Sequence, residues 1–141
     1  IVTFEPVRTK LLSQGGKEIF TTQQIPGEVV DVLVVHEDYL KKYNNNVSSL
    51  IDTWFKALEY KQQNMQEFAR ISAKRLKVSS DDVIASYNGL VLPDRAENKV
   101  LLDGSNARIN QTLLEIRRVL EQHGLIEEGI VLDGLISPFG R

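Results

Sequence analysis

The chain has 141 residues, 42% hydrophobic and 26% charged, which is the composition of an ordinary globular domain. Its formal net charge is −2 and its Lys and Arg residues are scattered, so neither a nucleic-acid-binding surface nor a polybasic membrane patch is predicted. The chain holds no cysteine, which excludes disulfides, thiolate metal sites and cysteine nucleophiles. No apolar segment approaches the roughly 18–20 residues that span a bilayer.

Both ends of the chain look like parts of a longer protein. Residues Ile1–Phe4 have the character of the middle of a strand, and the chain stops at Arg141, directly after a Pro-Phe-Gly sequence. No signal peptide is recognisable. We therefore expect a fragment, whose missing start could carry a targeting signal and half of a binding site.

The first 35 residues are expected to form a sheet and a crossing segment. Ile1–Phe4 and Lys17–Thr21 are short β-prone segments. Between them Val7–Gln14 carries its apolar residues on one face, which predicts a short helix ended by Gly15-Gly16.

The segment Val29–Val35 is the strongest strand prediction. It is β-branched almost throughout and interrupted only by Asp31, so it offers apolar side chains to both faces and is expected to be an interior strand. Pro26 and Gly27 predict a turn leading into it. The predicted fold class is therefore α/β, a small mixed sheet covered by helices.

Residues 36–141 are expected to be mainly helical. A short helix is predicted at Asp38–Tyr43, followed by a break at the three asparagines, with Asn46 as the N-cap of the next helix. In that helix the apolar positions follow i, i+3, i+4 spacing, and we expect its Trp and Phe to lie in the core, with ligand stacking as the alternative. These positions are Val47, Leu50, Ile51, Trp54, Phe55 and Leu58.

Three further helix starts are predicted. Asn64 has capping-box spacing to Glu67, in a helix expected to bury Met65, Phe68, Ala69 and Leu76. Ser79 is followed three residues later by Asp82, a fuller capping signature, and this accounts for the paired Asp81 and Asp82 without metal or acid–base chemistry. A last long helix is expected from Ser105 or Asn106 to His123.

The common catalytic patterns are missing from the sequence. The only histidines, His36 and His123, lie far apart in the chain, so no metal site is predicted. There is neither a Gly-x-Ser-x-Gly elbow nor a phosphate-binding glycine loop. We therefore predict a binding protein that is not an enzyme and has no cofactor.

Several segments, by their order and spacing, carry a resemblance to a known family. They are Val2–Pro6, Gly16-Lys17, Gln24–Gly27, Asp31–Val35, Trp54–Leu58, Ala73–Ser79, Gly124–Ile126 and Leu135–Pro138. Together they resemble the carboxyl-terminal half of a bacterial periplasmic solute-binding protein of an ABC transporter. The family is the one that serves nitrate, sulfonates, taurine and thiamine-type pyrimidines and has the type II periplasmic-binding fold.

The resemblance implies two α/β lobes with a solute in the cleft between them. Against that template this chain supplies about half, a single partial lobe with a sheet and crossing segment in residues 1–35 and helices in residues 36–141. It also implies a periplasmic or other extracytoplasmic location in a bacterium. The partners would be a small solute and a membrane transporter permease or receptor.

Five residues are candidate ligand-binding residues. Thr3, Phe4 and Glu5 match the cleft-lining segment of the family. There an aromatic ring can stack on a planar solute and a carboxylate can accept hydrogen bonds from an amine or amidine. A carboxylate argues against a sulfonate or nitrate, so a cationic or heterocyclic solute is expected. Glu5 capping the helix that follows is the alternative, and for Pro26 and Gly27 the alternative is a purely structural turn.

Other functions stay open at this point. The chain could be the ligand-sensing extracytoplasmic domain of a signalling receptor. Pyrimidine-precursor synthases share the family's fold, but they carry a cysteine-rich metal segment that this chain lacks. Finally, helices from Val47 onward could form an interaction module, in which exposed apolar edges drive self-association into a homodimer, for example by domain swapping.

Overall fold

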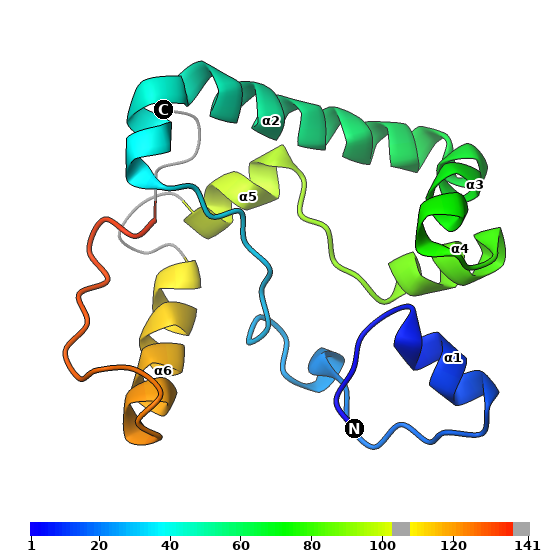
Figure 1. The fold of residues 1–141 in the computed structure, drawn as a ribbon, viewed down its shortest axis with the longest axis horizontal. Helices are drawn as coiled ribbons and strands as arrows, with labels where there is room; N and C mark the ends of the chain where they lie inside the picture. Colours follow the sequence, from blue (N-terminus) through cyan, green and yellow to red (C-terminus); the bar gives the residue numbers. More distant parts are fainter. Residues whose placement is uncertain (103–107, 137–141) are drawn as a thin grey trace. The chain divides into compact units, whose positions relative to one another are not determined.

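The computed structural model describes residues 1–102 and 108–136 and divides the chain into two compact units (Figure 1). The first unit comprises Ile1–Gln24 and Val35–Leu92, and the second comprises Ile25–Val34 and Pro93–Arg141. Both units are built from helices, and the described residues contain no β-strand. The predicted α/β fold class is therefore wrong, since the described part of the chain is all-α.

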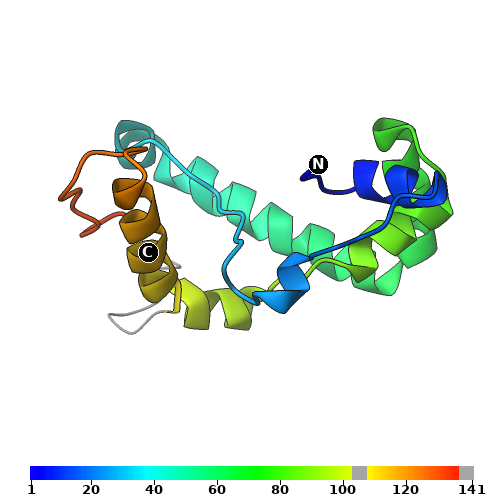
Figure 2. The same cartoon turned by 90° about the horizontal axis from the view of Figure 1, so that it is seen from below.

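None of the three predicted strands forms. Ile1–Phe4, Lys17–Thr21 and Val29–Val35 are non-helical, and no described residue pairs with them as a strand (Figures 1 and 2). The reason is that β-propensity measures how well a side chain fits a pleated, half-buried surface, and such a surface needs a neighbouring strand. Val32, Leu33 and Val34 are instead 58%, 60% and 81% exposed, so the expected interior strand is an exposed extended segment.

The first unit begins with two short helices and a long one. These are α1 (Val7–Ser13), the 3₁₀ helix η1 (Thr22–Gln24) and α2 (Glu37–Gln63). The helix α2 bends at Tyr43, where φ is −131° and ψ is 37° (Figure 1). The predicted break is thus a kink, and Asn46 lies inside α2 rather than capping it. His36 is the N-cap, because its Nδ1 accepts the Asp38 N–H at 3.3 Å.

Helices α3 (Met65–Leu76) and α4 (Ser80–Asn88) form the best-packed part of this unit. Ala69 on α3 and Val83 on α4 are fully buried, and α2 adds the buried Phe55 and Leu58. Leu76, which we expected in the core, is exposed.

Two aromatic rings extend this packing. The rings of Phe68 and Tyr87 meet edge to face with centroids 5.0 Å apart, a favoured aromatic geometry. The Lys61 Nζ lies 4.9 Å from the centroid of the Tyr87 ring. These contacts join the ends of α2, α3 and α4 into one small core.

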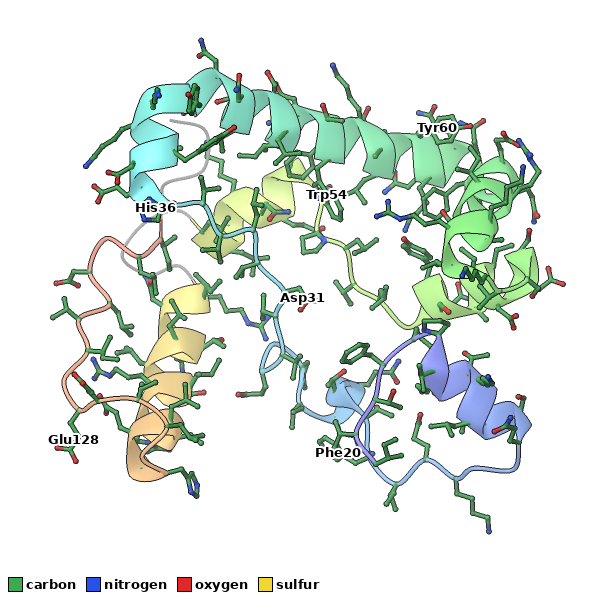
Figure 3. The ribbon with its side chains drawn as sticks, in the orientation of Figure 1. Phe20, Asp31, His36, Trp54, Tyr60 and Glu128 are labelled. Carbon is green, nitrogen blue, oxygen red and sulfur yellow. The ribbon has the colours of Figure 1, made fainter. Side chains whose placement is uncertain are left out.

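The apolar stripe predicted for α2 is only partly buried. Val47, Phe55 and Leu58 are buried, as expected. Trp54 and Leu50 are 52% and 54% exposed, so the expectation that Trp54 lies in the core is wrong (Figure 3). The described part of this unit therefore leaves some of its amphipathic surface uncovered.

Helix capping was predicted correctly for α4. Ser79 is its N-cap and forms the complete capping box with Asp82, and Gly89 is its C-cap. Asn64 is the N-cap of α3, as predicted, but the predicted capping box does not form. Its side chain makes no capping bond and donates instead to the Tyr60 carbonyl at 3.2 Å. The helix α3 ends at Lys77 in the left-handed conformation.

The second unit contains α5 (Arg95–Leu102) and α6 (Arg108–Gln122), which pack against each other. The sequence reasoning missed α5, although Asp94 and Glu97 have capping spacing and exchange two hydrogen bonds of 2.8 Å. Outside the described residues lie the predicted helix start at Ser105 or Asn106 and the end, Ser137-Pro138, of the last segment that carries the family resemblance. Within the described ranges no helix is long and apolar enough to cross a membrane.

Candidate functional site

The candidate residues Thr3, Phe4 and Glu5 lie directly before α1. Phe4 is 82% exposed, so its ring is open to a ligand, whereas Thr3 and Glu5 are half-buried. The Glu5 side chain belongs to a local hydrogen-bond network at the start of α1. The Phe4 ring and the Glu5 carboxylate thus come from neighbouring residues of one short segment.

The Glu5 carboxylate is held by three contacts. Its Oε1 accepts from Arg8 Nη1 at 2.9 Å, and its Oε2 accepts from the Thr9 hydroxyl at 2.7 Å and the Thr9 N–H at 3.2 Å. Arg8 Nε also donates to Glu18 at 2.6 Å, so one guanidinium joins two carboxylates. These contacts agree with the alternative that the sequence left open, in which Glu5 caps the helix that follows it.

The protonation of Glu5 follows from the same contacts. Partial burial raises the pKa of the Glu5 carboxyl, but the hydrogen bonds from Thr9 and Arg8 outweigh it, and the net pKa lies below its ordinary value. Glu5 is therefore ionised at neutral pH. Since a carboxylate offers about four acceptor positions and three are occupied here, roughly one acceptor position is left.

Pro26 and Gly27 form a turn on α6 in the second unit. Arg108 Nη2 donates to the Pro26 carbonyl at 3.2 Å, and the Thr112 hydroxyl donates to the Gly27 carbonyl at 3.3 Å. Gly27 has φ +89°, and a Cβ placed there would lie 2.7 Å from Arg108 Nη2. These contacts account for both residues as a structural turn, which is the alternative that the sequence left open.

The five candidate residues are therefore divided between the units. Thr3, Phe4 and Glu5 belong to the first unit, and Pro26 and Gly27 belong to the second. Neither unit by itself brings all five together.

A shallow hollow beside the same turn was not found from the sequence. It has a volume of about 290 Å³ and lies in the second unit, between Glu28 and α6. Its lining is formed by Glu28, Glu115, Ile116, Arg118, Val119 and Leu120. The signal in the sequence was indirect: Ile116 and Leu120 stand four residues apart in α6, which places them on one face of the helix.

The described residues contain no cluster of side chains that could hold a metal ion. Within residues 1–102 and 108–136, no group of three or more His, Asp or Glu side chains is placed to hold a metal ion. Asp82, one of the paired carboxylates, accepts from the Ser79 N–H and hydroxyl at 3.1 and 2.7 Å. These hydrogen bonds lower the pKa of Asp82, so its perturbation belongs to helix capping.

The comparisons with known proteins identify no relative: no family model matches the chain, and neither a curated protein nor a solved structure does. The resemblance to solute-binding proteins therefore rests on the motifs of this chain.

Proposed function

We propose that this chain binds a small solute as part of a bacterial ABC-transporter solute-binding protein of the extracytoplasmic space. The order and spacing of the motifs support this function. The observation that carries it is that an exposed Phe4 ring and the Glu5 carboxylate are neighbours in the chain, directly before α1. The proposal concerns these ligand contacts and does not depend on a sheet within the chain.

The chemistry of this pair favours a planar solute with an amine or amidine. An exposed aromatic face stacks on a flat ring, and an ionised carboxylate accepts hydrogen bonds from a cationic donor. Arg8 is committed to Glu5 and Glu18, with contacts of 2.9 and 2.6 Å. An anionic solute such as a sulfonate would therefore be repelled by the Glu5 carboxylate, and Arg8 would not be free to neutralise its charge.

The test is binding of the purified chain to a panel of amino-substituted pyrimidines, with taurine and nitrate as anionic controls. Isothermal titration calorimetry should detect the aminopyrimidines only. The Glu5→Gln variant should weaken binding by about tenfold or more, since a hydrogen bond to a charged group contributes about 1.5–3 kcal/mol. The Phe4→Ala variant should weaken it by up to about tenfold, since it removes the stacking of the ring.

Glu18→Gln is the matched control, because Glu18 shares Arg8 with Glu5 and lies outside the proposed contact. It should bind as the parent does, and circular dichroism should confirm that all variants keep their helices. No binding of any aminopyrimidine, or equal binding by Glu5→Gln and the parent, would overturn the proposal.

A ligand-sensing domain of a signalling receptor would bind a solute with the same residues. The two functions differ in the membrane partner. Capture of a transporter permease by the solute-loaded protein supports the transporter function, whereas capture of a receptor's transmembrane subunit supports the sensor.

A further inference from the structure

Most of the segment Val29–Val35 is exposed to solvent, although its composition is that of a buried interior strand. Val29, Val30 and Val32 are 64%, 47% and 58% exposed. Leu33 and Val34 are 60% and 81% exposed. Within the described residues no backbone hydrogen bond joins this segment to another part of the chain. Unpaired N–H and C=O groups on a β-branched run are a template for pairing with another strand.

We infer that Val29–Val35 pairs antiparallel with the same segment of a second copy of this chain. The sequence is self-complementary about Val32. In the register that places Val32 opposite Val32, Val30 faces Val34 and Val29 faces Val35. Pairs of β-branched residues directly opposite each other stabilise a sheet.

The charge of the segment agrees with this register. Asp31 stands opposite Leu33 rather than opposite the second Asp31, so two like charges do not meet. Because side chains alternate along a strand, one face of the pair is formed only by Val30, Val32 and Val34 of both copies. Asp31 lies on the other face, where water can reach it.

The buried area predicts a weak dimer. Two such segments would bury roughly 1,000 Å² in total, near the lower limit of specific interfaces. The contact is isologous, so it closes at two copies through a twofold axis at Val32. Dimer formation should therefore depend on protein concentration.

Cysteine cross-linking tests the register, because the chain contains no cysteine. Residues directly opposite in an antiparallel pair have Cα atoms about 4.5–5.5 Å apart, within reach of a disulfide. The Val32→Cys variant should therefore form a covalent dimer under a mild oxidant. Val30→Cys alone should not, because the two cysteines would lie about 13 Å apart, but a mixture of Val30→Cys and Val34→Cys should cross-link.

Val91→Cys is the matched control, since Val91 is a valine in another extended segment and is 89% exposed. It measures cross-linking by random collision, and Val32→Cys should exceed it several-fold. Equal yields from the two variants, or a Val30→Cys dimer as abundant as that of Val32→Cys, would overturn the inference.

Sedimentation equilibrium provides a second readout without cysteine. The Val32→Asp variant would place two carboxylates opposite each other and should be monomeric at concentrations where the parent dimerises. Val91→Asp should dimerise as the parent does. Dimerisation of Val32→Asp equal to that of the parent would contradict the inference, which does not rest on solute binding.

Discussion

Ser79 and Asp82 hold the start of α4 by exchanging hydrogen bonds. The Asp82 N–H donates to Ser79 Oγ at 3.1 Å, and the Ser79 N–H donates to Asp82 Oδ2 at 3.1 Å. The helix they start carries Val83, which is fully buried against the small core of the first unit. A local sequence signal therefore fixes the position of a core residue.

Loss of this cap should destabilise the first unit. Ser79→Ala removes the acceptor of the Asp82 N–H and should lower the free energy of unfolding by about 1 kcal/mol. Urea denaturation followed by circular dichroism measures the change. Ser80→Ala, one residue further along, is the control and should change the free energy by less than about 0.5 kcal/mol. Equal effects of the two substitutions would show that the capping box does not contribute.

Acid should destabilise the same unit through its carboxylates. The pKa values of Asp82 and Glu5 are both lowered in the folded chain, by hydrogen bonds that outweigh any burial. A lowered folded pKa gives stabilisation that is present above the unfolded pKa and is lost as pH falls through the folded pKa. Unfolding free energies measured from about pH 6 down to about pH 2 should therefore fall, and less steeply for Asp82→Asn. An identical pH dependence for Asp82→Asn and the parent would contradict this assignment.

Replacing Lys77 with glycine should stabilise the chain. Lys77 ends α3 with φ 58° and ψ 44°, a left-handed conformation that costs a residue with a Cβ about 1–2 kcal/mol. Lys77→Gly relieves this cost at the expense of chain entropy, so a gain of about 0.5–1 kcal/mol in the free energy of unfolding is expected. Lys74→Gly, inside the same helix, should instead lose about 1 kcal/mol. A loss for both variants would show that Lys77 is not strained.

Gly27 should tolerate alanine less well than Gly134 does. Both have positive φ, +89° and +78°, but only at Gly27 would the new Cβ meet a neighbour, Arg108 Nη2 at 2.7 Å. Moving Arg108 breaks its bond to the Pro26 carbonyl, so Gly27→Ala should lose about 0.5–1.5 kcal/mol more than Gly134→Ala. Thermal unfolding of the two variants measures the difference. Equal losses would mean that the Pro26–Gly27 turn is not fastened to α6.

The sequence predicted the helices well because their signals are local. The spacing of Val47, Phe55 and Leu58 and the cap at Ser79 act within one or two turns, and the structure confirms them. Helix α5 was missed because it has only eight residues and its large apolar side chains stand together at its end, Val100–Leu102, rather than at i, i+3, i+4 spacing.

The strand predictions were wrong because the formation of a strand depends on residues outside the segment itself. Val29–Val35 has every local property of an interior strand, but a strand is completed only by a neighbour, and no described residue supplies one. The candidate site follows the same rule. The helix-start role of Glu5 and the turn at Gly27 were foreseen as alternatives from local sequence, whereas the contacts of Gly27 with Thr112 and of Pro26 with Arg108 span more than 80 residues and could not be foreseen.

Amide hydrogen exchange of peptides covering residues 29–35, at low and high protein concentration, tests the central claim most directly. The claim is that this segment is extended and unpaired in one chain and becomes paired between two. At low concentration it should exchange as fast as an unstructured peptide, while peptides containing Ala69 and Val83 stay protected, and at high concentration its exchange should slow. Strong protection of residues 29–35 that is independent of concentration would contradict the account, because it would show that the segment is already paired within a single chain.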